Sequence, residues 1–167
     1  MRLVTATALL VAAVPAQGQD PAFDPACANV RVALPADLVG WAEQVPVAAG
    51  TEPGGGATIR PGQAVRASLH PARHLKLSPA PKTVGPNGGT LTLVIAAPGT
   101  YRLALGEPTW IDLIRDGKLV QSSAHSNGPK CTGIRKMIDF VLPAGNYTVQ
   151  LSGSQAESVT LLAVKVA

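Results

Sequence analysis

The stretch PGTYRLAL (residues 98–105) returns in altered form as AGNYTVQL (residues 144–151). Both stretches follow the pattern Gly-x-Tyr-x-aliphatic-x-Leu. Because side chains alternate between the two faces of a strand, the tyrosine, the aliphatic residue and the leucine of each stretch share one face. The glycine allows the chain to turn sharply into each strand. We therefore predict two equivalent core strands that are entered from similar turns.

The same alternation of apolar and polar residues continues on both sides of these stretches. From residue 58 onward, short alternating runs are separated by turns that contain Pro and Gly, at intervals too short for long helices. Asp116-Gly117, between two apolar runs, is a strong β-hairpin signal. About seven or eight strands at this spacing are typical of an antiparallel β-sandwich or jelly roll. We predict an all-β fold of about 7–9 strands.

The N-terminus has the features of a secretory signal peptide. Arg2 precedes an apolar run that ends at Val14, and small residues follow before Gln19. This order of a basic, an apolar and a small-residue region is typical of an export signal. We therefore predict a signal peptide at residues 1–18 and a periplasmic or secreted location. We expect no transmembrane segment, because no later apolar run is long enough to span a bilayer.

The composition changes twice along the rest of the chain. Residues 19–56 are rich in Pro and Ala and end in GTEPGGG (50–56), which we interpret as a flexible break. Apolar residues from Leu34 to Val45 fall near helical spacing and allow one short helix. We predict an N-terminal arm at residues 19–56 and a β-sandwich domain at residues 57–167.

Cys27 and Cys131 are the only cysteines of the chain. In an exported protein an even number of cysteines suggests disulfide bonding, so we predict an intramolecular bond that ties the arm to the sandwich. Closing a loop of about 100 residues stabilises a fold by on the order of 4–5 kcal/mol in the chain-entropy model. Two free buried thiols and an intermolecular bridge are the alternatives.

Charge is distributed unevenly around a formal net charge of +4. The arm carries five acidic residues against one basic residue, whereas basic residues dominate two later stretches. A basic face attracts anionic partners. We predict an anion-binding site from the basic residues Arg66, Arg73, Lys130, Arg135 and Lys136. The alternative is that the acidic arm covers this face.

An exported basic face has three kinds of partner: an anionic polysaccharide, the phosphates of lipopolysaccharide, and an acidic patch on a protein partner. We expect no nucleic-acid partner, because the chain has only two Trp, two Tyr and two Phe and no aromatic platform for bases. We expect the sandwich to bind its partner without catalysing a reaction.

The three histidines of the chain, His70, His74 and His125, form an alternative site. Pro71 disfavours the helix that would place His70 and His74 on one face. A turn at Pro71 would bring the pair together, and His125 would complete a three-histidine site of a kind that zinc, copper or iron accepts. The competing interpretation is three surface histidines at strand ends, with no cofactor.

No set of residues predicts nucleophilic catalysis. A disulfide removes the reactive thiolate of Cys131, and Ser122 lies near His125 without a Gly-x-Ser-x-Gly elbow. We therefore assign no catalytic residue. Asp112 lies within an apolar stretch and needs a hydrogen-bonding or ionic partner, for which Arg135 is a candidate.

The order PGTYRLAL…WIDLIRDGKLV…FVLPAGNYTVQL resembles small secreted β-jelly-roll modules of the bacterial pre-peptidase C-terminal type. Those modules repeat a Gly-x-Tyr strand and end in a Leu-x-x-Gly-x-Tyr strand. The resemblance covers roughly the last 75 residues. It implies an accessory binding or secretion module rather than a catalyst.

A second resemblance extends over most of the chain and is strongest in AHSNGPKCTGIRKMIDF (124–140). This stretch is similar to short exported proteins of alphaproteobacteria that are labelled homogentisate 1,2-dioxygenase. The resemblance implies a metal-dependent dioxygenase. Enzymes with that activity hold iron with two histidines and a glutamate.

Overall fold

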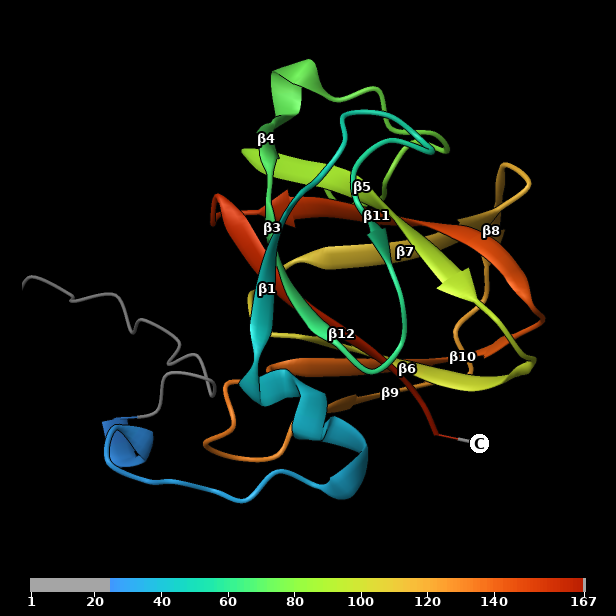
Figure 1. The fold of residues 1–167 in the computed structure, drawn as a ribbon. Coiled ribbons are helices and arrows are strands. Elements are labelled where there is room, and N and C mark those ends of the chain that lie inside the picture. The colour runs from blue at the N-terminus through green and yellow to red at the C-terminus, as the bar shows by residue number, and fades with distance from the viewer. Residues whose placement is uncertain (1–24, 167) are drawn as a thin grey trace, which may run out of the picture.

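Two β-sheets of six strands each face one another in the computed structural model, which describes residues 25–166 (Figure 1). The predicted signal peptide at residues 1–18 lies outside the described residues. The described helices are short 3-10 segments, and strands dominate. The all-β sandwich class is therefore confirmed. In this part of the chain, no helix is long and apolar enough to cross a membrane.

The first sheet has its last strand in the middle. Its strands, in spatial order, are β1 (Gln44–Ala48), β3 (Ala64–Ser68), β12 (Ser158–Lys165), β6 (Gly99–Leu105), β10 (Lys136–Leu142) and β9 (Ala124–Asn127). β12 lies between β3 and β6 and pairs with both in antiparallel fashion. β1 and β9 form the two edges of this sheet.

The second sheet is built around the long strands β5 and β11. Its strands are β2 (Thr58–Ile59), β4 (His70–Pro71), β5 (Asn87–Ile95), β11 (Gly145–Ser154), β7 (Trp110–Arg115) and β8 (Lys118–Val120). β2 and β4 both pair with β5, on the side away from β11. β5, β7 and β11 form the upper layer in Figure 1, and β6, β9 and β10 lie below them.

The described residues form twelve strands, more than the predicted 7–9, and the sheets are mixed rather than purely antiparallel. β1 pairs with β3 in parallel, and β2 pairs with β5 in parallel. β2 and β4 have two residues each, which is too short for alternation to reveal them. β1 comes from the segment predicted as an arm, so the sandwich begins before residue 57.

The two Gly-x-Tyr stretches occupy equivalent places, one in each sheet. Tyr101 in β6 is 4% exposed and Tyr147 in β11 is 2% exposed. The hydroxyl of Tyr101 donates to the carbonyl of Ala97 at 2.7 Å, and the hydroxyl of Tyr147 donates to the carbonyl of Pro143 at 2.8 Å. Each bond closes the turn before its strand, as in a tyrosine corner. Two equivalent core strands, entered from similar turns, are thus present as predicted.

The inward faces of both sheets form one core. Alternate residues of β6 and β5, such as Leu103 and Leu93, are fully buried in it. The predicted hairpin also forms, because β7 and β8 pair across Asp116-Gly117. Both turn residues have positive φ values, of 52° and 72°, which a type I′ turn requires.

A second apolar cluster lies on the outer face of the first sheet, beneath η3 (Ala36–Ala42). This 3-10 helix, the blue-green coil below the sheet in Figure 1, buries Leu38 and Trp41 to 1% and 6% exposure. Ala64 and Ala104 are members of the cluster. Their small side chains leave room for the larger leucine and indole, so the arm packs on the sheet.

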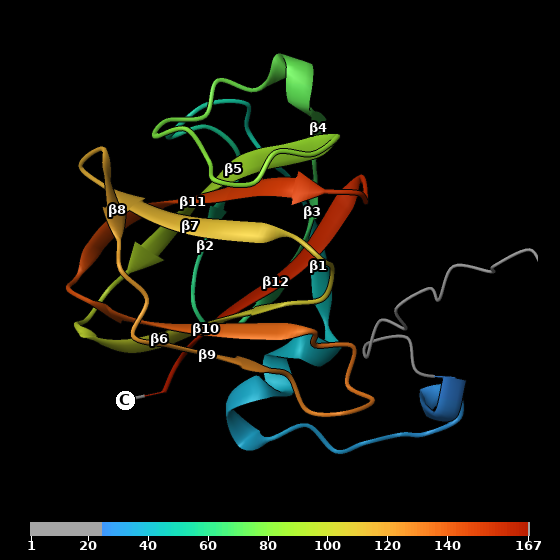
Figure 2. The ribbon, with the colours of Figure 1, turned by 180° about the vertical axis from the view of Figure 1, so that it is seen from behind.

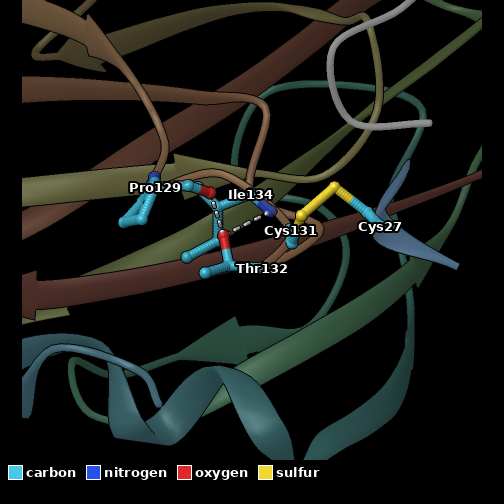
Figure 3. The surroundings of a disulfide bond; sticks show 5 residues. All are labelled: Cys27, Pro129, Cys131, Thr132 and Ile134. Atoms are coloured by element: carbon cyan, nitrogen blue, oxygen red, sulfur yellow. Dashed lines mark hydrogen bonds between the residues drawn. A yellow bond between two sulfur atoms is a disulfide. The ribbon is translucent and has the colours of Figure 1, made fainter. Parts of the chain in front are cut away.

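The predicted disulfide between Cys27 and Cys131 is formed, with 5.0 Å between the Cα atoms. It joins η2 (Pro25–Cys27) to the loop before β10 (Figure 3). The two cysteines are 104 residues apart in the sequence. The bond therefore ties the start of the arm to the same sheet that η3 covers.

Thr132 holds the loop that carries the disulfide. Its hydroxyl donates to the carbonyl of Pro129 at 2.7 Å and accepts from the N–H of Ile134 at 3.2 Å, as Figure 3 shows. The indole N–H of Trp41 donates to the carbonyl of Thr132 at 3.0 Å. The arm, the loop and the outer face of the first sheet are thus joined by packing, hydrogen bonds and a covalent bond.

The glycine-rich stretch 50–56 is a hydrogen-bonded connection and not the predicted flexible break. Gly50 and Thr90 exchange two backbone hydrogen bonds, at 2.8 and 2.9 Å, and the hydroxyl of Thr90 donates to the carbonyl of Glu52 at 2.6 Å. A Cβ atom at Gly56 would lie 2.2 Å from the carbonyl oxygen of Thr90. The glycines here permit close packing of backbones, which composition alone does not distinguish from mobility.

The outer face of the second sheet is polar and lies beneath a long loop. Gln150 and Ser152 of β11 are 0% and 3% exposed although both point away from the core. The segment 72–86, which begins with η4 (Ala72–His74), passes above β5 and β11 in Figure 2. The side-chain N–H of Gln150 donates to the carbonyl of Pro79 in this segment at 3.0 Å. The loop thus covers polar side chains rather than a second apolar cluster.

Candidate ligand-binding groove

A groove with a volume of about 430 Å³ opens at the side of the sandwich, between β7–β8 and β9–β10. Among the described residues, β8 pairs with β7 only at Leu113–Arg115, so the first half of β7 is a sheet edge. Figure 2 shows β7 and β8 above β10 and β9 on this side. The apolar floor comes from the inner faces of both sheets and includes Ile111, Ile138 and Phe140. We call this site the open groove.

Trp110, Asp112 and Lys136 form a connected set in the open groove. Trp110 and Asp112 are two residues apart on β7, so their side chains share one face. The indole N–H of Trp110 donates to Oδ1 of Asp112 at 3.0 Å. The ammonium of Lys136, at the start of β10, lies 5.2 Å from the centroid of the Trp110 ring. Such a cation–π contact favours this position of the ammonium and leaves its N–H donors available.

Lys82 and His125 complete the polar rim of the open groove. Lys82 comes from the loop over the second sheet, and His125 comes from the edge strand β9, where it pairs with Ile138. Both residues are exposed. The charged residues that line the open groove are Lys82, Lys136 and Asp112, and the Asp112 carboxylate accepts from the Trp110 indole. The rim therefore has an excess of positive charge.

A second hollow of about 430 Å³ adjoins the open groove and shares His125 and Lys136 with it. It adds Arg135, Ser126 and Asn127 to the same side of the molecule. The backbone N–H of Arg135 donates to the carbonyl of Leu105 at 2.8 Å, which fixes the start of β10. The basic surface thus extends from Lys82 across the groove to Arg135.

Only part of the predicted anion site comes together. Arg135 and Lys136 line the second hollow beside the open groove, and Lys130 lies in the disulfide loop, where it borders a small hollow with Arg135. Arg66 lies on β3, with β12 and β6 between it and β10, and forms an ion pair with Glu107 at 4.0 Å. Arg73 lies in η4. The five residues form no single face, because they come from two separated strands, from η4 and from the disulfide loop, and local sequence patterns do not encode this arrangement.

The predicted three-histidine site is not formed. In the described part of the chain, no three His, Cys, Asp or Glu side chains are grouped to hold a metal. His70 lies in β4, and its Nε2–H donates to the carbonyl of Ala49 at 2.8 Å, whereas His74 ends η4. His125 lies on the first sheet. A site of two histidines and a glutamate, which the resemblance to dioxygenases implies, is likewise not found among the described residues.

Reasoning from sequence did not identify Trp110 and Lys82 as residues of the open groove. The i, i+2 spacing of Trp110 and Asp112 in a strand was sufficient to predict their hydrogen bond. This partner for Asp112 differs from the predicted Arg135. No local signal predicted that Lys82 would lie near β7, because Lys82 belongs to a loop whose path depends on the packing of both sheets.

The acidic arm contacts a different basic residue, away from the open groove. Arg102 of β6 donates to both carboxylate oxygens of Asp139, at 2.8 and 2.9 Å, and to Asp37 of the arm at 3.4 Å. Hydrogen bonding to Asp139 is the main cause of the raised pKa of Arg102, and attraction to both carboxylates acts in the same direction. Arg102 therefore stays positively charged. Asp20 and Asp24 lie outside the described residues.

Comparison of the chain with protein-family models and with curated proteins finds no match. The two resemblances noted from sequence motifs therefore stay predictions. The functional assignment depends on the chemistry of the open groove itself.

Proposed function

We propose that this chain is an exported, non-catalytic β-sandwich module that binds an anionic component of the cell envelope in the open groove. The observation that carries the proposal is the ammonium of Lys136, held over Trp110 beside Lys82 and His125. No described part of the arm covers these residues. The proposal thus depends on a positive charge placed by the Trp110 ring at an accessible hollow.

The composition of the open groove favours a ligand with an anionic group and an apolar part. Ligand sites in proteins combine apolar surface with a few placed polar groups. Here the floor is apolar, and the rim offers N–H donors from Lys82 and Lys136. Phosphate and carboxylate groups form strong charge-assisted hydrogen bonds with such donors. Asp112, whose carboxylate accepts from Trp110, disfavours a second anionic group at that end.

Two features support an exported location. Residues 1–18 have the order of regions that is typical of a signal peptide. The disulfide between Cys27 and Cys131 is of a kind that persists in oxidising compartments such as the periplasm. An anionic envelope component is the partner that both the compartment and the charge favour.

Calorimetric titration of residues 19–167 with polygalacturonate tests the proposal, with neutral dextran as the control polymer. We expect binding to polygalacturonate that weakens at least tenfold between about 50 and 300 mM salt, because screening weakens contacts between exposed charges. Dextran should not bind. Binding that is independent of salt, or equal for both polymers, would contradict an anion site.

Matched variants assign that binding to the open groove. Lys82→Gln and Lys136→Gln should each weaken polygalacturonate binding about tenfold, which corresponds to roughly 1.4 kcal/mol. Lys165→Gln is the control, since Lys165 is an exposed lysine on β12. Equal losses in all three variants would show that only net charge matters, and would overturn the assignment to the groove.

A further inference from the structure

A small apolar pocket lies beside the open groove, under the loop that covers the second sheet. Its volume is about 210 Å³, and its lining includes Leu75, Leu77, Pro81 and Val84. Val84 is 84% exposed at this pocket, although valine is an apolar residue. A concave site with a mostly apolar lining is typical of small-molecule binding. We call this site the apolar pocket.

The apolar pocket and the open groove are neighbours at two points. In the loop, Pro81 and Thr83 line the pocket, and Lys82 between them lines the groove. In the second sheet, Ser152 of β11 lines the pocket and is the direct partner of Trp110 of β7, which lines the groove. Partners on adjacent strands lie about 5 Å apart. A single small molecule can therefore contact both sites.

Ser152 marks the side of the apolar pocket nearest the groove. Its hydroxyl is buried, at 3% residue exposure, and has no hydrogen-bond partner within residues 25–166. The side-chain oxygen of Gln150, the next outward residue of β11, also has none in the same range. A buried polar atom without a partner destabilises a fold, and such atoms are rare in native proteins. A ligand oxygen that accepts from the Ser152 hydroxyl would supply the missing partner.

We infer that the two sites together bind one anionic amphiphile, with its acyl chain in the apolar pocket and its charged head at Lys82 and Lys136. This inference rests on the proposed function and names the class of anionic envelope ligand, a lipid with a phosphate or carboxylate head. The oxygen that links head and chain lies at Ser152. A free anion would leave the apolar pocket unused, and a neutral hydrocarbon would leave the lysines unused.

The size of the apolar pocket limits the length of the chain. An apolar cavity of about 150 Å³ holds benzene, which has six carbon atoms. By that ratio the pocket, at about 210 Å³, holds about eight carbons. Longer chains would extend past Val84 into solvent or into a membrane surface. The pocket thus selects for an acyl chain but not for its full length.

Calorimetry with three probes tests this inference: octyl phosphate, methyl phosphate and octyl glucoside. A buried methylene strengthens binding roughly fourfold, so octyl phosphate should bind at least 100-fold more tightly than methyl phosphate. Octyl glucoside, which has the same chain and no charge, should bind at least tenfold more weakly than octyl phosphate. Equal binding of octyl and methyl phosphate would overturn the inference, and so would equal binding of the two octyl compounds.

Variants separate the apolar pocket from the groove. The double variant Leu77→Ser/Val84→Ser should reduce octyl phosphate binding at least tenfold and leave polygalacturonate binding within twofold. Val39→Ser is the control, because Val39 is also an exposed valine, at 61%, and lies on η3 rather than at the pocket. Ser152→Ala should reduce octyl phosphate binding several-fold without changing that of methyl phosphate. Unchanged octyl phosphate binding in the double variant would overturn the inference.

The outcomes distinguish this inference from the proposed function. If polygalacturonate binds through Lys82 and Lys136 but octyl phosphate gains nothing over methyl phosphate, the amphiphile inference is wrong and the anion site stands. If neither polygalacturonate nor octyl phosphate depends on the two lysines, the proposed function is wrong as well.

Discussion

The outer faces of the two sheets differ in composition and in what covers them. The first sheet presents a cluster of apolar residues, and the arm covers it with Leu38 and Trp41 and is fixed there by the disulfide. The second sheet presents Gln150 and Ser152, and its covering loop leaves side-chain atoms of both without a partner among the described residues. One face is thus sealed by packing, and the other keeps unused polar groups beside two hollows.

This difference separates stability from binding in the same small fold. Buried apolar surface and satisfied hydrogen bonds stabilise the first face. The unsatisfied buried polar atoms of the second face cost stability, and such atoms are rare in native proteins unless a ligand or water meets them. The two tryptophans of the chain lie on either side of this division, with Trp41 in the sealed cluster and Trp110 in the open groove.

The largest expected effect comes from releasing the arm. Replacing Cys27 and Cys131 by Ser should lower the free energy of unfolding by about 4 kcal/mol, since the chain-entropy model gives about 4.7 kcal/mol for a loop of this length. Urea denaturation of the variant and of the oxidised protein measures the difference. Ligand binding by the folded variant should not change. A loss below about 1 kcal/mol would show that packing alone holds the arm.

The two tryptophans give a direct contrast between the faces. Trp41→Ala should cost about 3 kcal/mol of stability, because it removes a buried indole and leaves a cavity under η3. Trp110→Ala should cost only about 1 kcal/mol, because Trp110 is partly exposed, but it should weaken anion binding. Thermal denaturation and calorimetry on both variants test the contrast. The opposite pattern, with binding lost only in the Trp41 variant, would reverse the roles of the two faces.

These predictions use features that the sequence revealed to different degrees. Alternation in short runs was sufficient for the all-β class, because a period of two places every second side chain on one face only in an extended strand. The pairing of Cys27 with Cys131 was predictable because the chain has no other cysteine. The open groove was not predictable as a whole, because Lys82, Trp110 and Lys136 meet only after two sheets have stacked.

The parallel pairing of β1 with β3 was also not predictable from local sequence patterns. β1 and β3 both alternate, but nothing in their residues states that they run in the same direction or that β12 lies beside β3. The stretch 50–56 was misread because glycine serves both mobility and close packing. Composition reports which conformations a segment allows, whereas neighbours from distant parts of the chain decide which one it adopts.

A smaller effect is expected from the ion pair beneath the arm. Arg102→Met should lower the free energy of unfolding by about 1–2 kcal/mol, because it removes two charge-assisted hydrogen bonds to Asp139 from a partly exposed site. The raised pKa of Arg102 adds stability at every pH below its range and is lost only as pH rises through it. Between about pH 6 and 9 the difference between variant and parent should therefore be constant. A difference that changed sharply across that window would contradict this account.

The smallest effects are expected from removing the hydroxyl groups of the two tyrosine corners. Tyr101→Phe removes one hydrogen bond and should cost about 1 kcal/mol. Tyr147→Phe should cost slightly more, because the Tyr147 hydroxyl also accepts from Nη1 of Arg115 at 3.0 Å. Chemical denaturation of both variants resolves the order. Equal losses would mean that the contact of Arg115 with Tyr147 adds nothing.

The position of β12 constrains when this molecule can fold. Residues 158–165 pair with β3 on one side and with β6 on the other, so the first sheet stays in two pieces until they are available. On a ribosome, that point comes only after nearly the whole of the described sequence has been synthesised. Until then the nascent chain lacks a complete core, so the two halves of the first sheet can join only after the last strand has been made.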